Sequence, residues 1–84
     1  MIVPTLNLNG SSADDLINPR LAAMGHLMDA IEALRQAAPN GRDYPGDHEG
    51  LQLARDLHFS RLEDIKSLRE ELMREAVRIK EQVS

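Results

Sequence analysis

The chain contains no cysteine among its 84 residues, which excludes both a disulfide framework and a metal site built on thiolates. Its only aromatic side chains are Tyr44 and Phe59, so it offers neither a stacking platform for single-stranded nucleic acid nor an aromatic core. The net charge is -4, and lysine and arginine are interspersed with acidic residues rather than gathered into a basic stripe. We therefore expect no binding to duplex nucleic acid.

Long apolar runs are also missing. No stretch approaches the roughly 20 residues that cross a bilayer. The first residues lack the basic start and the apolar core of a signal peptide. We therefore expect no membrane partner, and the absence of cysteine favours a reducing cytoplasm.

A chain of this length forms one small domain, residues 1–84, near the size at which a core needs reinforcement by assembly. We divide it into an extended arm (1–11), a first helical region (12–38), a loop (39–47) and a long second helix (48–83). In the arm, Leu6 and Leu8 alternate with polar residues, which is typical of a short extended segment with both leucines on one side. Ser12, with Asp15 three residues later, predicts a capping box at the start of a helix.

The first helical region is amphipathic, because apolar residues recur at steps of three and four from Leu21 to Leu34. Pro19 comes too late to be the first residue of the helix that Ser12 starts. Either one helix kinks there, or a short turn ends at Asn18 and a new helix begins, and we favour this break near Pro19. Gly25 costs about 1 kcal/mol relative to alanine inside a helix, and it indicates a close helix crossing.

The second helix follows Asp47, a suitable N-cap, and carries an apolar seam to its end. Off this seam, Leu53, Leu57 and Phe59 predict a second neighbour near the loop, for which the N-terminal segment is a candidate.

The two helical regions differ in length. At about 1.5 Å per residue the second helix would reach about 54 Å, against about 29 Å for the unbroken part of the first. A hairpin of these arms would leave the far end of the long helix uncovered. We therefore predict an interface between copies of the chain at Leu68, Leu72, Ala76, Ile79 and Val83. The predicted fold is all-α, an antiparallel helical hairpin with a long second helix and a short extended N-terminal segment, self-associating into a helical bundle.

The histidines do not predict a metal site. The stretch that begins with His48 and Glu49 lacks the second histidine of the zinc-protease pattern, because Gln52 stands at that position. His26 and His58 lie beside or on the apolar faces, and we interpret them as packed, hydrogen-bonded histidines rather than ligands. We predict no metal and no cofactor.

Two acidic pairs have the spacing found in all-α nucleotide pyrophosphohydrolases, which hold magnesium with carboxylates one helical turn apart. These pairs are Asp29 with Glu32 and Glu71 with Glu75. Two arginines lie beside the second pair, and no fuller acidic repeat follows. We therefore treat this enzyme as the weakest alternative and predict no catalytic residue.

The loop gathers more varied chemistry than any other segment, in Asn40, Arg42, Asp43 and Tyr44 beside Gly41. Arginine binds phosphate through two N–H groups, tyrosine stacks on a base, and an amide or carboxylate reads a polar edge. The same residues also form an ordinary turn. A ligand site and plain turn chemistry therefore both remain open.

The order of these pieces resembles a family of small bacteriophage and prophage proteins whose general function is not established. The resemblance covers most of the chain: Leu6 to Ser12, an amphipathic helix, Ala38-Pro39-Asn40-Gly41-Arg42-Asp43-Tyr44, and a long charged helix. Where family members carry a second tyrosine after the first, this chain has Pro45, which leaves no paired aromatic. The resemblance implies a phage origin and the host cytoplasm as the location.

Phages use small oligomeric proteins to sequester nucleotide signals of bacterial immunity, to build or assemble virions, and to inhibit host proteins. We predict a homo-oligomer that binds a cyclic or ADP-ribose-derived nucleotide without turnover, as a counter-defence sponge. Arg42 would hold phosphate, Tyr44 a base, and Asn40 or Asp43 a polar edge. The alternative is a helical interaction module that serves virion assembly or binds a host protein.

Overall fold

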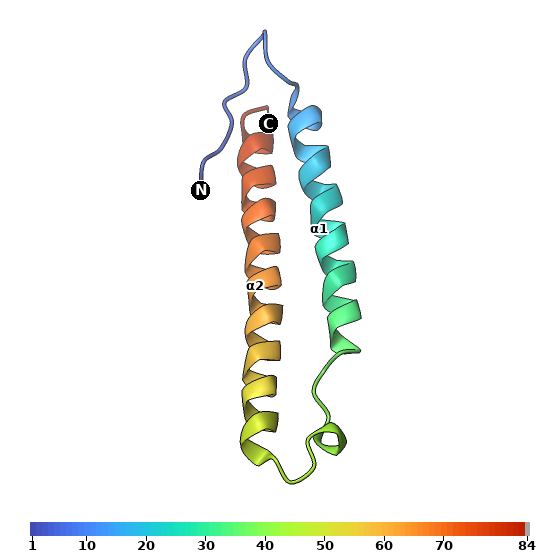
Figure 1. The fold of residues 1–84 in the computed structure, drawn as a ribbon. Helices are drawn as coiled ribbons and strands as arrows, with labels where there is room; N and C mark the ends of the chain where they lie inside the picture. The colour runs from blue at the N-terminus through green and yellow to red at the C-terminus, as the bar shows by residue number, and fades with distance from the viewer. Residues whose placement is uncertain (84) are drawn as a thin grey trace.

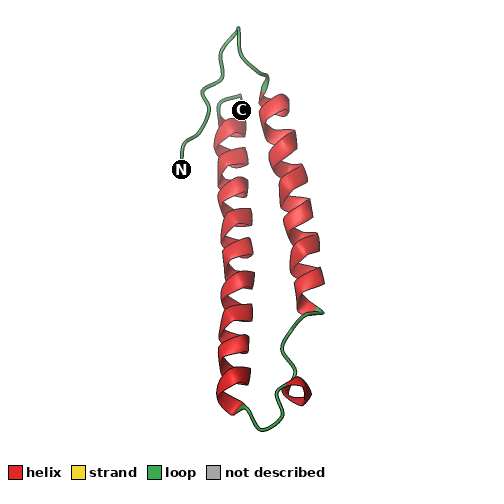
Figure 2. Cartoon of the chain, in the orientation of Figure 1, coloured by secondary structure: helices red, strands yellow, loops and turns green. Residues whose placement is uncertain are grey.

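The computed structural model describes residues 1–83 and consists of two antiparallel helices joined by a loop (Figure 1). Helix α1 covers Ala13–Arg35, the 3-10 turn η1 covers Gly41–Asp43, and helix α2 covers His48–Glu81. No strand occurs within this described part of the chain (Figure 2). The predicted all-α hairpin is confirmed. The molecule is a rod of 64 × 19 × 18 Å.

Both helices begin at the caps that the sequence predicts. The Ser12 hydroxyl accepts from the Asp15 backbone N–H at 3.1 Å, and the Asp15 carboxylate accepts from the Ser12 N–H at 3.3 Å, which completes the capping box. At α2 the Asp47 carboxylate accepts from the Gly50 N–H at 2.8 Å. Gly46, just before this cap, has φ of +70°, a value that favours glycine.

The predicted break near Pro19 is wrong, because α1 runs without interruption through it. Pro19 leaves the Asp15 carbonyl without its helical N–H donor. Both residues are exposed, so water can reach the carbonyl. The Arg20 guanidinium donates to the Leu16 carbonyl at 2.8 Å, and Arg20 pairs with Glu75 of α2 at 3.2 Å. Both contacts are made by the residue that follows Pro19, and one of them joins this turn to α2.

The expectation that the hairpin leaves the far end of α2 uncovered is also wrong. The start of α1 lies beside the end of α2, as the Arg20–Glu75 pair shows, and Ile79 is 0% exposed. The loop-proximal part of α2 lies instead beside the segment that joins the helices (Figure 1). A Cβ built at Gly41 in that segment would lie 3.6 Å from Leu51 Cδ2. The connection therefore supplies the length that α1 lacks.

The N-terminal arm lies along the end of α2, on the side away from α1 (Figure 1). The Gln82 side chain holds it by donating to the Pro4 carbonyl and accepting from the Leu6 N–H, both at 2.9 Å. The extended course ends near Leu6, because a turn follows in which the Gly10 N–H donates to the Asn7 carbonyl at 3.3 Å. Leu8 is fully exposed in this turn, so Leu6 and Leu8 do not share a packed side.

Candidate functional site

The loop residues proposed as a ligand site form an ordered turn. Asn40 caps η1, since its side-chain oxygen accepts from the Arg42 N–H at 3.0 Å. The Asp43 N–H donates to the Asn40 carbonyl at 3.0 Å, and the Tyr44 N–H donates to the Gly41 carbonyl at 3.1 Å. The Asn40 oxygen is therefore already used by the turn.

The remaining groups of this loop differ in exposure. Arg42 and Asp43 are exposed, whereas Tyr44 is half-buried. The Arg42 guanidinium forms no hydrogen bond or ion pair with any other described residue. The loop thus presents one cation with no partner among the described residues and one partly covered tyrosine ring, which is less than the convergent set of side chains that the sequence suggested.

The five residues predicted as an interface between copies divide by burial. Ala76 and Ile79 are buried within the single chain, and Leu72 is half-buried. Leu68 and Val83 remain 45% and 56% exposed. Ala76 and Ile79 thus need no second copy to leave water.

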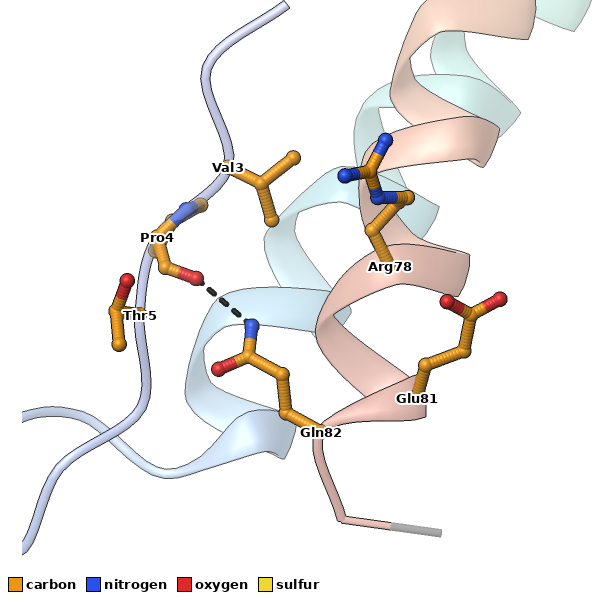
Figure 3. Close-up of a pocket in the computed structure, with 6 residues that line it drawn as sticks. All are labelled: Val3, Pro4, Thr5, Arg78, Glu81 and Gln82. Carbon is orange, nitrogen blue, oxygen red and sulfur yellow. Dashed lines mark hydrogen bonds between the residues drawn. The ribbon is translucent and has the colours of Figure 1, made fainter.

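A groove of about 380 Å³ lies between the arm and the end of α2 (Figure 3). Val3, Pro4 and Thr5 form one wall, and Arg78, Glu81 and Gln82 form the other. The Pro4–Gln82 hydrogen bond spans the groove, and Val3 on the arm lies across from Arg78 on α2 (Figure 3). The sequence predicted neither the attachment of the arm through Gln82 nor this groove, because no local pattern pairs a glutamine with a backbone 76 residues away.

Several large apolar side chains remain exposed in rows along the helices. On the loop-proximal part of α2, Leu53 is 69% and Phe59 is 66% exposed. The second neighbour predicted for this region is absent from the single chain, because the arm lies at the opposite end (Figure 1). On α1, Leu21 and Met28 are exposed although the sequence placed them with buried Met24 and Ile31. The apolar face of α1 is therefore wider than the strip that α2 covers.

The histidines and acidic pairs do not come together. His58 is half-buried on the seam, but His26 is exposed, so its predicted burial is wrong. Glu75 is paired with Arg20, while Asp29 and Glu71 are exposed. Within residues 1–83, no three histidine or acidic side chains are grouped closely enough to hold a metal ion.

Neither helix in the described range has the length and apolar character to cross a membrane. Comparison with known protein families, with curated proteins and with solved structures yields no match for this chain.

Proposed function

We propose that this chain is a helical assembly module, a small protein that acts by associating through its helix faces, first of all with itself, rather than by catalysis. The supporting observation is the set of large apolar side chains left 39% to 69% exposed in rows along α1 and α2. A rod 19 × 18 Å across has room for one buried seam between two helices. Rows of apolar side chains outside that seam are typical of contact surfaces.

The resemblance to small phage proteins provides the setting for this proposal. We propose that the module serves virion assembly or binds a host protein through its helices. Light scattering coupled to gel filtration, on the full chain from micromolar to millimolar concentration, should give a mass above that of one chain. A single-chain mass throughout this range would contradict the proposal. Detection of the chain in purified virions by mass spectrometry would support the virion role.

Nucleotide capture by the loop is a second proposal, supported by the uncommitted guanidinium of Arg42. Calorimetry with cyclic and ADP-ribose-derived nucleotides should then show binding that Arg42→Ala abolishes, because the phosphate contact is lost. Arg61→Ala is the matched control, since Arg61 is also exposed and lies on α2 away from the loop. Absence of heat with every nucleotide, or equal binding by the two variants, would contradict this second proposal.

A further inference from the structure

The two helices share one face on which apolar and charged side chains alternate. A groove of about 150 Å³ marks this face, lined by Met28, Ile31, Arg35, Lys66, Arg69 and Glu70. Leu21 precedes Met28 by seven residues, so it lies on the same side of α1. By the same seven-residue spacing, Phe59 lies on the same side of α2 as Lys66, and Val77 lies on the same side as Glu70.

On α2 this face forms one regular stripe. Its members are all exposed and follow one another by four, three, four, three and four residues: Phe59, Glu63, Lys66, Glu70, Met73 and Val77. This is the spacing of contact positions in a coiled coil. The buried seam uses other positions of the same helix, among them Ala76 and Ile79. Helix α2 therefore carries a second contact surface that the single chain does not use.

We propose that this stripe is the interface of an antiparallel dimer, in which a second copy packs α2 against α2 about a two-fold axis that crosses the stripe midway between Lys66 and Glu70. The stripe is complementary to itself only in this direction. Lys66 then meets Glu70 of the second copy, Glu70 meets its Lys66, and Phe59 meets its Val77. Glu63 aligns with Met73 of the second copy. Arg74 of the second copy follows Met73 and is within reach of Glu63. This inference rests on the self-association proposed above and specifies its geometry.

Helix α1 independently gives the same axis. The Arg69 side chain donates to the Met24 carbonyl at 3.4 Å, so the turn of α1 at Met24 lies near the turn of α2 at Arg69. A two-fold axis at that level brings Leu21 against Met28 of the second copy. Two helices with unrelated sequences thus pair apolar residues about one shared point. In a two-fold contact each pair occurs twice, so this symmetry doubles every match.

The position of Gly25 fits this arrangement. Gly25 is exposed, and a Cβ added to it meets nothing within 4 Å in the single chain, so the close crossing predicted from the sequence is not inside the hairpin. In the dimer Gly25 lies beside the axis, where α1 approaches its own copy. The absence of a side chain there allows the helices to come close.

The apolar contribution is substantial for a chain of this size. Leu21, Met28, Phe59, Met73 and Val77 are between 39% and 66% exposed, and the dimer would cover them in both copies. Lys66 now pairs with Glu63 of its own chain at 3.5 Å, with both side chains about half exposed. In the dimer it would also meet Glu70 of the second copy, in a site partly removed from water.

Charge reversal with mixing tests this interface. Lys66→Glu and Glu70→Lys each place like charges across the axis, and each alone should raise the dimer dissociation constant by roughly tenfold or more. An equimolar mixture of the two variants should form a heterodimer as tight as the wild type, because both cross-axis pairs are again opposite in charge. An effect confined to one chain, on helix stability for example, cannot be rescued by mixing. Sedimentation equilibrium of the full chain provides the measurement.

Matched controls are Arg61→Glu and Glu71→Lys, which reverse exposed charges on α2 off the stripe and should leave the dimer unchanged. If the wild type associates but the stripe variants behave like these controls, or if mixing fails to restore the dimer, this interface is wrong while self-association stands. If the wild type forms trimers or larger rings, the two-fold interface is likewise wrong. If the wild type is a monomer up to millimolar concentration, both proposals fail together.

Discussion

At the scale of single residues, Gly25 is an unfavourable choice for the isolated hairpin. It lies in the interior of α1, is exposed, and has open space where a Cβ would stand. We predict that Gly25→Ala raises the free energy of unfolding of the dilute, monomeric chain by about 0.5 to 1 kcal/mol, because alanine loses less backbone entropy on folding.

Urea denaturation followed by circular dichroism measures this change. Ala22→Gly is the matched control, since Ala22 is also exposed in α1 and should show a loss of similar size. A lower stability of the Gly25→Ala monomer would mean that the helix backbone near Gly25 is not free, contrary to its surroundings in the structure.

Asp47 and Gly50 form a coupled pair at the start of α2. The Asp47 carboxylate accepts from the Gly50 N–H, and a Cβ at position 50 would strike that same carboxylate. Gly50→Ala alone should therefore fail to stabilise the chain, because the gain in helix propensity is offset by the loss of the cap. Asp47→Ala should cost about 0.5 to 2 kcal/mol. In that background we expect Gly50→Ala to add about 1 kcal/mol of stability.

A double-mutant cycle of unfolding free energies measures this coupling. Additive effects of the two substitutions would show that the cap does not depend on the missing Cβ at position 50.

At the scale of elements, local signals predicted the helix starts but not the course of α1 through Pro19. Capping depends on residues within one turn of the helix start. Ser12 and Asp15 were therefore sufficient to predict the start of α1, and Asp47 was sufficient to predict the start of α2. Next to Pro19, the Arg20–Glu75 pair joins residues 55 positions apart. Such contacts between the two helices are not visible in a local pattern, which shows only the preference of proline for a helix boundary.

The arm is the element that depends most on one side chain. The Gln82 carboxamide makes two hydrogen bonds to it, one as donor and one as acceptor, as a neighbouring strand would. We predict that Gln82→Ala frees the arm, because alanine has neither the donor for the Pro4 carbonyl nor the acceptor for the Leu6 N–H. Hydrogen exchange at the Leu6 N–H should then rise to the rate of an unprotected amide.

Glu81→Ala, at the neighbouring exposed position, is the control and should leave this exchange rate unchanged. Protection of the Leu6 N–H in Gln82→Ala would show that other contacts hold the arm.

At the scale of the whole molecule, the hairpin was predictable and its alignment was not. The three- and four-residue spacing of apolar positions is sufficient to predict two helices and a loop. The position of α1 along the length of α2 depends on the path of the segment that joins them, which lies beside the loop-proximal end of α2 (Figure 1). The predicted interface at Ala76 and Ile79 assumed that α1 stops short of these residues. In the structure α1 covers them. The exposed rows, by contrast, became recognisable only once burial in the single chain was known.

The antiparallel dimer predicts a particular distance between copies. The chain has no cysteine, so Leu53→Cys introduces a single site for a nitroxide spin label, at a position 69% exposed and off the stripe. With the axis at the level of residue 68 along α2, the two labels would lie 15 residues away from it in opposite directions. At 1.5 Å per residue, their separation along the bundle is about 45 Å.

Pulsed electron–electron double resonance on this labelled protein measures this separation, because every dipolar signal arises between copies. The antiparallel dimer predicts a distance distribution centred at about 45 Å or slightly above. A peak below about 25 Å, as parallel neighbours at helix-packing distance would give, or no dipolar signal at millimolar concentration, would contradict it.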